Sequence, residues 1–300
     1  MMTLSPSQYA LAVPLVRDCR AELSVAATLE GQNPGQVLVD SDVCPRAAVI
    51  RTTETTAIAG DASDASLYGG IRETLGFMEV VTADTPDWEA VMDRIHPNPY
   101  LRRYLRRQYL ARELRYRDYR DHLPAGLSLE RLSPAHLEGL ENSEPVRKWA
   151  ASWGLAHFFA DGAGFVIRDG RTICAWSLTD CRIGDRAAIG IVVDARWRRR
   201  GLAGVVSAAN ADWWFSQGMD TLEWLCVAAN AGSQATARKL GFALEREYAA
   251  FTPVPPYEND SDQTPEQWRA WDAFYRAAGA YRTHPAEYAA VGERIARILS

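Results

Sequence analysis

The chain has 300 residues, of which 47% are hydrophobic and 24% are charged, and its formal net charge is −5. This length and composition suit a globular protein of two domains, because single hydrophobic cores stop growing near this size. The acidic excess excludes a strong general attraction to nucleic acid or to an anionic membrane surface, and it favours a cationic small molecule such as an amine.

The cysteines and the N-terminus argue against further classes of protein. The five cysteines are an odd number without a CxxC pair, which argues against a disulfide framework and against a metal site. Residues 1–14 lack the basic and then apolar regions of a signal peptide, and no uncharged apolar stretch reaches membrane-spanning length. We therefore expect a cytoplasmic protein without a membrane partner.

The first 125 residues begin with a predicted helix over 5–27 and continue with short strands over 37–39, 47–50 and 55–59. A helical pattern then covers residues 97–123, with eight arginines among five tyrosines. Such a segment could stack on nucleic acid and bind its phosphates. Its leucines recur at helical spacing and acidic residues interrupt the basic charge, so the favoured interpretation is an amphipathic helix with solvated guanidinium groups.

Beyond residue 125, strands and helices alternate. The predicted elements are a strand over 127–132, helices over 134–141 and 145–159, strands over 164–168, 172–180, 187–193 and 221–227, a helix over 234–240, and helices from 264 to the end.

A glycine loop follows the strand predicted over 187–193. It reads Arg198-Arg199-Arg200-Gly201-Leu202-Ala203, and a helical pattern continues from it. A strand, a tight loop and a helix aim successive backbone N–H groups at a bound anion, and the positive end of the helix dipole adds to the attraction. Taken alone, the loop indicates an anion site or a plain solvated connection.

A second motif follows the strand predicted over 221–227. A turn at Asn230 precedes a helix that Ser233 is expected to cap, and Gly241-Phe242 ends that helix. With Arg198-x-x-Gly201-x-Ala203 ahead of Asn230-x-x-Ser233 and Lys239-Leu240-Gly241-Phe242, the chain resembles the GCN5-related N-acetyltransferase (GNAT) superfamily.

This resemblance implies an α/β (α+β) fold with a mixed, mainly antiparallel, splayed sheet flanked by helices. It implies that acetyl-CoA lies between the strand ending near Val193 and the strand at 222–227, with its pyrophosphate on the N–H groups of residues 199–203. Asn230 would meet the cofactor or hold the loop beside it. The cofactor-binding residues implied are Ile191, Val192, Val193, Arg198, Arg199, Arg200, Gly201, Leu202, Ala203, Asn230 and Ser233.

Scattered residues also resemble the two-part acetyltransferase group that includes zwittermicin-resistance proteins. They lie at 37–40, 45–50, 59–61, 168–177 and 226. That similarity implies a degenerate GNAT-like domain over residues 1–125, a catalytic acetyl-CoA-binding domain over 126–257 and a helical tail over 258–300.

The catalytic residues are less well defined. Many members of the superfamily carry a tyrosine acid where this chain has Ala237, and an acidic residue where it has Ala188. The remaining candidates for the base are Asp180, Glu223 and Asp194, each of which could equally be a solvated charge.

Tyr248 and Tyr257 could donate a proton or could be core residues. Cys226 could be a nucleophile, but within Trp224-Leu225-Cys226-Val227 it is better interpreted as a small buried hydrophobic residue.

The leading hypothesis is an N-acetyltransferase that moves acetyl directly from acetyl-CoA to a primary amine of a small molecule, such as an antibiotic or amino compound. The alternative is a non-catalytic acyl-CoA-binding regulatory or scaffold protein, as Ala237 and Ala188 would allow. The aromatic stripe of the C-terminal helices either docks a partner or a second copy, giving a homodimer, or packs on the chain itself.

Overall fold

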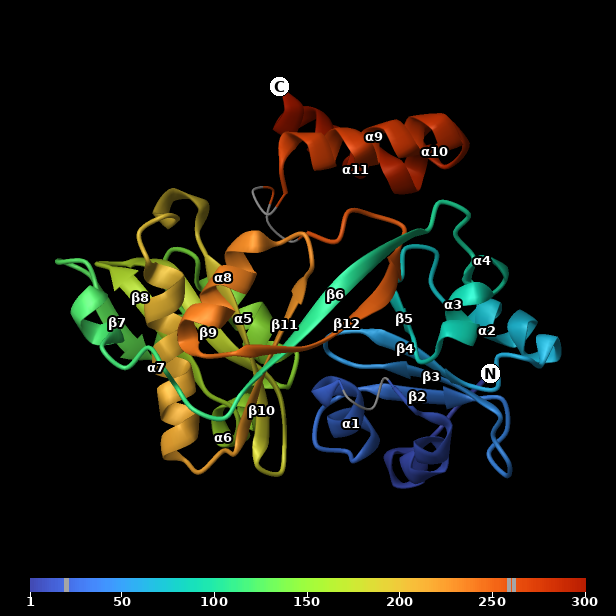
Figure 1. Ribbon diagram of the computed structural model, residues 1–300, viewed down its shortest axis with the longest axis horizontal. Coiled ribbons are helices and arrows are strands. Elements are labelled where there is room, and N and C mark those ends of the chain that lie inside the picture. The colour runs from blue at the N-terminus through green and yellow to red at the C-terminus, as the bar shows by residue number, and fades with distance from the viewer. Residues whose placement is uncertain (19–21, 258–259, 261–262) are drawn as a thin grey trace.

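The strands join into a single sheet in the computed structural model, which describes residues 1–18, 22–257, 260 and 263–300 (Figure 1). Taken in order across the sheet, the strands in these residues are β1 (Met2–Thr3), β2 (Gln36–Val39), β3 (Ala47–Arg51), β4 (Thr56–Gly60), β5 (Val81–Ala83), β12 (Ala243–Thr252), β6 (Arg102–Ala111), β11 (Thr221–Val227), β10 (Arg186–Val193), β9 (Thr172–Ile183), β8 (Gly164–Asp169) and β7 (Ser128–Arg131). The α-helices are α1 (Leu23–Leu29), α2 (Tyr68–Thr74), α3 (Pro86–Ala90), α4 (Met92–Ile95), α5 (Ser143–Ala151), α6 (Leu155–Asp161), α7 (Leu202–Ser216), α8 (Ala231–Leu240), α9 (Pro265–Ala278), α10 (Ala280–Thr283) and α11 (Pro285–Leu299), and 3-10 turns lie at Pro6–Leu15, Ala65–Leu67, Tyr119–His122, Pro134–Leu137 and Ala195–Trp197.

The sheet contains the same arrangement twice, with one strand exchanged between the two copies. In the first copy, the antiparallel strands β2, β3 and β4 are followed by β5, which is parallel to β4. In the second copy, β8, β9 and β10 are antiparallel and β11 is parallel to β10. The next strand along the chain after β5 is β6, but β6 pairs with β11, whereas β12 pairs with β5. The first half of the chain (residues 1–125) therefore supplies β6 to the sheet of the second half (residues 126–257), and the second half supplies β12 to the sheet of the first.

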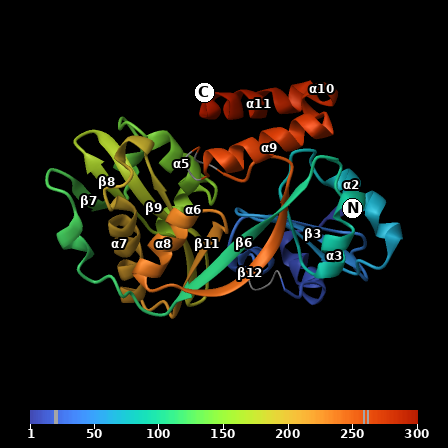
Figure 2. The ribbon, with the colours of Figure 1, turned by 45° about the horizontal axis from the view of Figure 1, so that its top comes forward.

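The two exchanged strands also pair with each other along their full length, from Ala243 opposite Leu110 to Thr252 opposite Arg102. Figures 1 and 2 show them as a long ribbon that connects the two halves of the molecule. This confirms the expected mixed, mainly antiparallel sheet flanked by helices.

Helices cover both faces of the second half of the sheet. Phe165 and Ile167 of β8 pack in a core with α7 and α8, while Val166 between them packs with α5, α6 and α1 on the opposite face. This alternation follows from the two-residue period of a strand. No helix within the described residues has the length and apolar character needed to cross a membrane.

The helix expected over residues 97–123 is wrong, because its centre is the strand β6. Local propensity favours a helix there, but β6 lies between β11 and β12 and pairs with both, so tertiary pairing overrides it. In a strand, the arginines alternate between faces: Arg106 is largely buried, whereas Arg107 forms an ion pair with Glu247 of β12 at 2.7 Å.

The helix expected over residues 5–27 is also divided. A 3-10 segment with Pro14 inside it covers Pro6–Leu15, and the α-helix α1 begins at Leu23. Residues 19–21 of the expected helix lie outside the described part of the chain. All residues of α1 are buried, because Leu23 and Ala27 pack in the core of the second half while Val25 and Leu29 pack in the core of the first. Farther along, the helix expected over 134–141 is only a short 3-10 turn.

The aromatic stripe of the C-terminal helices is buried against the chain itself. Trp268, Trp271 and Tyr275 of α9 share a core with Tyr288 of α11 and with Tyr100, which lies two residues before β6. The hydroxyls of Tyr275 and Tyr288 both donate to the carbonyl oxygen of Pro253, at 2.8 and 3.0 Å. In Figure 2, these helices lie across the top of the molecule as a separate layer.

The strand exchange predicts how fragments of the chain behave. A fragment of residues 126–257 lacks β6, the strand between β11 and β12, so we expect it not to unfold cooperatively when expressed alone. The full chain should show a single cooperative transition by circular dichroism. Adding a fragment of residues 1–125 should restore a cooperative transition by supplying β6. A cooperative thermal transition of the 126–257 fragment alone would contradict this prediction.

Candidate functional site

A gap opens in the sheet between β10 and β11. These parallel strands pair only from Arg186 opposite Thr221 to Ala188 opposite Glu223. The register between β10 and β9 shifts between Ala188 and Ile189, where β10 begins to diverge from β11. The extra residue at this shift is Asp180 of β9, and such an irregularity increases the local twist of the strand pair at the position where β10 leaves β11. The backbone of Ile191, Val192 and Val193 therefore faces the gap without pairing to β11.

The glycine loop lies at the open end of this gap, where α7 begins. Arg199 and Gly201 have left-handed backbone conformations, with φ of 64° and 79°. A side chain at Gly201 would meet no atom within 4 Å, so the conformation rather than the space favours glycine there. The first hydrogen bonds of α7 come from the N–H groups of Gly204 and Val205 to the carbonyl oxygen of Gly201. The amides of residues 199–203 precede these bonds, as an anion site at a helix N-terminus requires.

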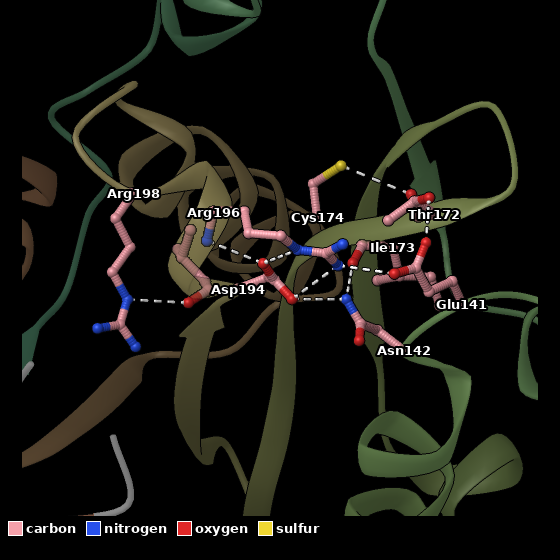
Figure 3. A network of polar contacts seen from close by, with 9 residues as sticks. Glu141, Asn142, Thr172, Ile173, Cys174, Asp194, Arg196 and Arg198 are labelled. Atoms are coloured by element: carbon pink, nitrogen blue, oxygen red, sulfur yellow. Dashed lines mark hydrogen bonds and ion pairs between the residues drawn. The ribbon is translucent and has the colours of Figure 1, made fainter. Parts of the chain in front are cut away.

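Asp194 anchors the start of this loop (Figure 3). Its carboxylate accepts hydrogen bonds from the backbone N–H and side chain of Arg196 and from Nδ2 of Asn142, the last at 2.8 Å. Arg196 also reaches Glu141 at 2.8 Å, and Nε of Arg198 donates to the carbonyl oxygen of Val193 at 3.2 Å. The hydrogen bonds from Arg196 lower the pKa of Asp194. Asp194 therefore shapes the loop and is a poor base.

The second motif also has a structural role. Asn230, not Ser233, is the N-cap of α8: its Oδ1 accepts from the N–H of Ser233 at 2.9 Å. The expectation that Ser233 caps the helix is thus wrong, because the helix begins one turn earlier than predicted. The hydroxyl of Ser233 instead accepts from Nε1 of Trp224 at 2.9 Å and so connects α8 to β11 beside the gap.

The first half has a matching loop after β4 that differs in charge. There, Asp61 accepts from the N–H of Ser63 and Asp64 accepts from the N–H of Ser66, both at 3.0 Å. Hydrogen bonds from the hydroxyls of Ser63 and Ser66, and then these backbone bonds, lower the pKa of both carboxyls. Backbone N–H groups that could face a phosphate are occupied by the loop's own carboxylates, whose charge repels anions. The anion-binding geometry is therefore not repeated at this loop.

A cavity of about 470 Å³ lies on the face of the sheet opposite α7. Its lining comes from both halves of the chain and consists of Thr53, Glu54, Pro145, Trp149, Ser152, Trp176, Asp180 and Val192. The volume is in the range of small-molecule sites. Val192 brings the cavity next to the diverging part of β10.

Gly190 of β10 makes room for this lining. A Cβ atom there would lie 2.5 Å from the ring of Trp149 and 2.7 Å from Oδ2 of Asp180. Both side chains therefore lie directly against the strand backbone, which explains a glycine in the middle of a strand.

Glu223, another predicted catalytic carboxylate, is buried and is not among the residues that line the cavity. Its side chain is 1% exposed, accepts a hydrogen bond from the amide of Gln108, and accepts another from the N–H of Leu23 at 3.3 Å. Burial raises the pKa of Glu223 to about 7, and the nearby carboxyl of Glu22 adds to the rise. Because Glu223 is opposite Ala188 in the strand pair, it supplies a carboxyl next to the position where the resemblance implied one.

Tyr248 belongs to a buried polar cluster next to Glu223. Arg106 and Arg246 lie over its ring at 6.0 and 4.6 Å, and its hydroxyl is buried. Burial raises the pKa of Tyr248, and it also raises the pKa of Glu22, which Arg106 and Arg246 counteract. Tyr248 is not among the residues that line the cavity.

Cys226 and Tyr257, a possible nucleophile and a possible proton donor, are both buried in the core. Cys226 is 8% exposed, and burial raises the pKa of its thiol, which suits a small hydrophobic residue rather than a nucleophile. Tyr257 is likewise buried, at 8% exposed, and it packs near Trp268.

Of the eight residues that line the cavity, only Asp180 and Val192 were predicted as site residues. The sequence motifs did not indicate Thr53, Glu54, Pro145, Trp149, Ser152 and Trp176, nor Gly190 against which two of the lining side chains lie. Glu54 lies in the turn between β3 and β4, far from either motif. Gly190 interrupts a predicted buried strand, and this was the one signal that could have indicated a close approach of other side chains.

Comparisons with known proteins fit this geometry. The profile of the GNAT acetyltransferase family matches residues 14–251. A search of the curated proteins finds no significant match.

Several solved structures share the fold of the chain. A GCN5-related N-acetyltransferase-like protein from Streptococcus suis is 18% identical, with a TM-score of 0.66, over 82% of this chain and 98% of that one. A tandem GNAT protein from the clavulanic acid biosynthesis pathway is 13% identical, with a TM-score of 0.55, over 85% and 99%. A GCN5-related N-acetyltransferase from Sphaerobacter thermophilus is 12% identical, with a TM-score of 0.54, over 87% and 97%.

The buried carboxyl of Glu223 predicts a pH dependence of stability. Its pKa rises from an ordinary 4.5 to about 7 on folding, so the folded protein holds one more proton than the unfolded chain between these values. The stability that this proton contributes is present below pH 4.5 and is lost as the pH rises to 7, by about 3 kcal/mol. The substitution Glu223→Gln stays neutral and can still accept from Gln108, so the free energy of unfolding should fall less between pH 5 and 8.

Urea unfolding at both pH values measures this difference. Glu138→Gln, which removes an exposed carboxylate, serves as the control and should retain the wild-type pH dependence. Parallel pH dependences for the wild type and Glu223→Gln would contradict the assignment.

Proposed function

The chain belongs to the GNAT acetyltransferase family, and from that premise we propose that it is an N-acetyltransferase that moves an acetyl group from acetyl-CoA to a primary amine of a small molecule. An antibiotic or another amino compound would suit the cavity. The observation that carries the proposal is that one strand, β10, borders both proposed sites. On the donor side it forms one edge of the gap and leads into the glycine loop, and on the acceptor side Val192 lines the cavity.

The donor is proposed to bind along the gap. The N–H groups of residues 199–203 would hold the pyrophosphate, aided by the charge of Arg198, Arg199 and Arg200. The backbone of Ile191, Val192 and Val193 would pair with the pantetheine arm, as an added strand pairs with an open edge. Asn230 would hold the turn beside the arm. Gly201, Leu202 and Ala203 would supply the tight start of α7.

We propose direct transfer between the two sites. The amine nitrogen attacks the thioester carbonyl carbon, the C–N bond forms, the C–S bond breaks, and the thiolate leaves and takes up a proton. The amine must first lose a proton, and a base within reach of it is needed. Asp180 lines the cavity and is our assignment for that base.

The other two candidates have supporting roles in this proposal. Glu223 has a pKa of about 7, which suits a group that exchanges protons at neutral pH, and we assign it to take up the proton that Asp180 removes from the amine. Tyr248 contacts Arg106 and Arg246, and Arg106 in turn lies 3.5 Å from Glu54 of the cavity. Tyr248 would therefore position this charge cluster.

A non-catalytic acyl-CoA-binding protein is the alternative. Ala237 favours it, since this fully buried residue of α8 cannot act as the acid that many GNAT members place there. Positioning of the amine next to the thioester can provide most of the rate without a dedicated acid, so we prefer the enzyme.

We further propose a cytoplasmic protein without nucleic-acid or membrane partners. Any homodimer would use a surface other than the aromatic stripe of α9, because that stripe is buried within the chain.

Acetyl-CoA binding tests the donor site. Replacing Ala203 by Glu places a carboxylate in the first turn of α7, where it would repel the pyrophosphate, so we expect the affinity measured by calorimetry to fall at least about tenfold. Ala65→Glu places the same charge in the matching loop of the first half and should leave the affinity and a stoichiometry of one per chain unchanged. Equal effects of the two substitutions, or a stoichiometry of two, would contradict a single site after β10.

Asp180 is tested by turnover. Incubation with acetyl-CoA and a panel of amines, polyamines and amine-bearing antibiotics, with mass detection of products, identifies an acceptor. With that acceptor, Asp180→Asn should lower kcat about a hundredfold, because a positioned base contributes that much, and it should leave acetyl-CoA affinity unchanged. A kcat within twofold of the wild type would remove Asp180 from the mechanism.

A further inference from the structure

We propose that Glu54 and Trp176 set the acceptor specificity of the cavity, and that they select a small cationic amine that also carries a neutral oxygen able to accept a hydrogen bond, such as an amino alcohol. This inference rests on the proposed function. It assigns a role to the first half of the chain, because Glu54 comes from the turn between β3 and β4.

Trp176 indicates the oxygen. Its side chain lines the cavity and is 4% exposed, yet its Nε1 has no hydrogen-bond partner among the residues that the structure describes. A buried N–H group without an acceptor is costly, and a ligand oxygen can supply the missing bond. Five other indole N–H groups do have acceptors: those of Trp88, Trp153, Trp214, Trp224 and Trp268. Trp176 differs from them in having no acceptor within the described residues, and because its side chain borders the cavity, we assign the missing acceptor to a ligand bound there.

Glu54 and Asp180 indicate the cation. Both carboxylates line the cavity, whereas Arg106, which lies 3.5 Å from Glu54, does not. Arg106 is largely buried and also interacts with Glu22. It therefore holds Glu54 in place without adding a positive charge to the surface of the cavity. A partly buried pair of carboxylates favours an ammonium group and disfavours a ligand carboxylate.

The shape of the cavity restricts the body of the acceptor. Trp149 lies against Gly190 and provides an aromatic wall, and the hydroxyl of Ser152 is engaged with the carbonyl oxygen of Trp149 at 2.7 Å. An apolar or aromatic body of modest size suits this wall, with the amine directed toward Asp180 and Glu54 and the oxygen toward Trp176.

Binding of four related probes tests this specificity independently of turnover. The probes are 2-amino-1-phenylethanol, 2-phenylethylamine without the oxygen, 1-phenyl-1,2-ethanediol without the amine, and the zwitterion phenylalanine. Calorimetry on the full chain saturated with CoA should show the amino alcohol binding about tenfold more tightly than each of the other three, since each lacks one hydrogen bond or charge contact or adds a repulsive charge.

Two substitutions assign the preference to residues. Trp176→Phe keeps the ring but removes Nε1–H, so it should weaken amino alcohol binding about tenfold and leave 2-phenylethylamine unchanged. Glu54→Gln should weaken both amines and leave the diol unchanged. The matched controls are Trp213→Phe on α7, across the sheet from the cavity, and the exposed Glu138→Gln, and neither should alter the binding of any probe.

The outcomes distinguish this inference from the proposed function. If no probe binds, or if Trp176→Phe weakens both amines equally, the assigned specificity is overturned even when acetyl-CoA binds and other amines are acetylated. If the probes bind as expected but no amine is acetylated, the specificity holds and the proposed transfer fails. Tighter binding of phenylalanine than of the amino alcohol would overturn the role of Glu54.

Discussion

Backbone hydrogen bonds between β6 and β12 run the length of both strands and connect the two halves of the chain into one sheet. Because β6 then pairs with β11 and β12 with β5, neither half has a complete sheet without the other. The turn that carries Glu54 can reach the cavity of the second half only because the crossing strands hold the first half against it.

Charged groups between the halves are stabilised by the same packing. Glu22, Arg106, Glu223 and Arg246 lie around the crossing strands, and burial raises the pKa of both carboxyls. Arg246 donates to Oε1 of Gln108 at 2.7 Å and Arg106 lies 3.5 Å from Glu54, so a shift of one half relative to the other would separate these buried charges from their partners at a cost in free energy. The cluster therefore favours one relative arrangement of the halves, which in turn keeps Glu54 at the edge of the cavity.

Divergence of β10 from β11 has a comparable role for the donor. The shift in register at Ala188 opens a backbone edge, and Asp194 then turns the chain so that α7 begins at the end of that edge. The register shift at Ala188, the hydrogen bonds of Asp194 and the left-handed backbone conformation of Gly201 each involve only a few neighbouring residues. Together they place an anion site beside a free strand edge, while the matching loop of the first half uses its carboxylates to satisfy its own amides.

The sequence by itself determined the second half well, because loop and cap motifs act over a few residues. Arg198 to Ala203, Asn230 and Gly241-Phe242 were sufficient to predict the family and the mixed splayed sheet, and they carry the prediction of a donor loop. Only the tertiary structure decided that residues 102–111 form a strand, since pairing on both sides outweighs local helix propensity. It also decided the cavity that we propose for the acceptor, because Glu54, Trp176 and Asp180 are far apart in the chain and meet only through long-range packing.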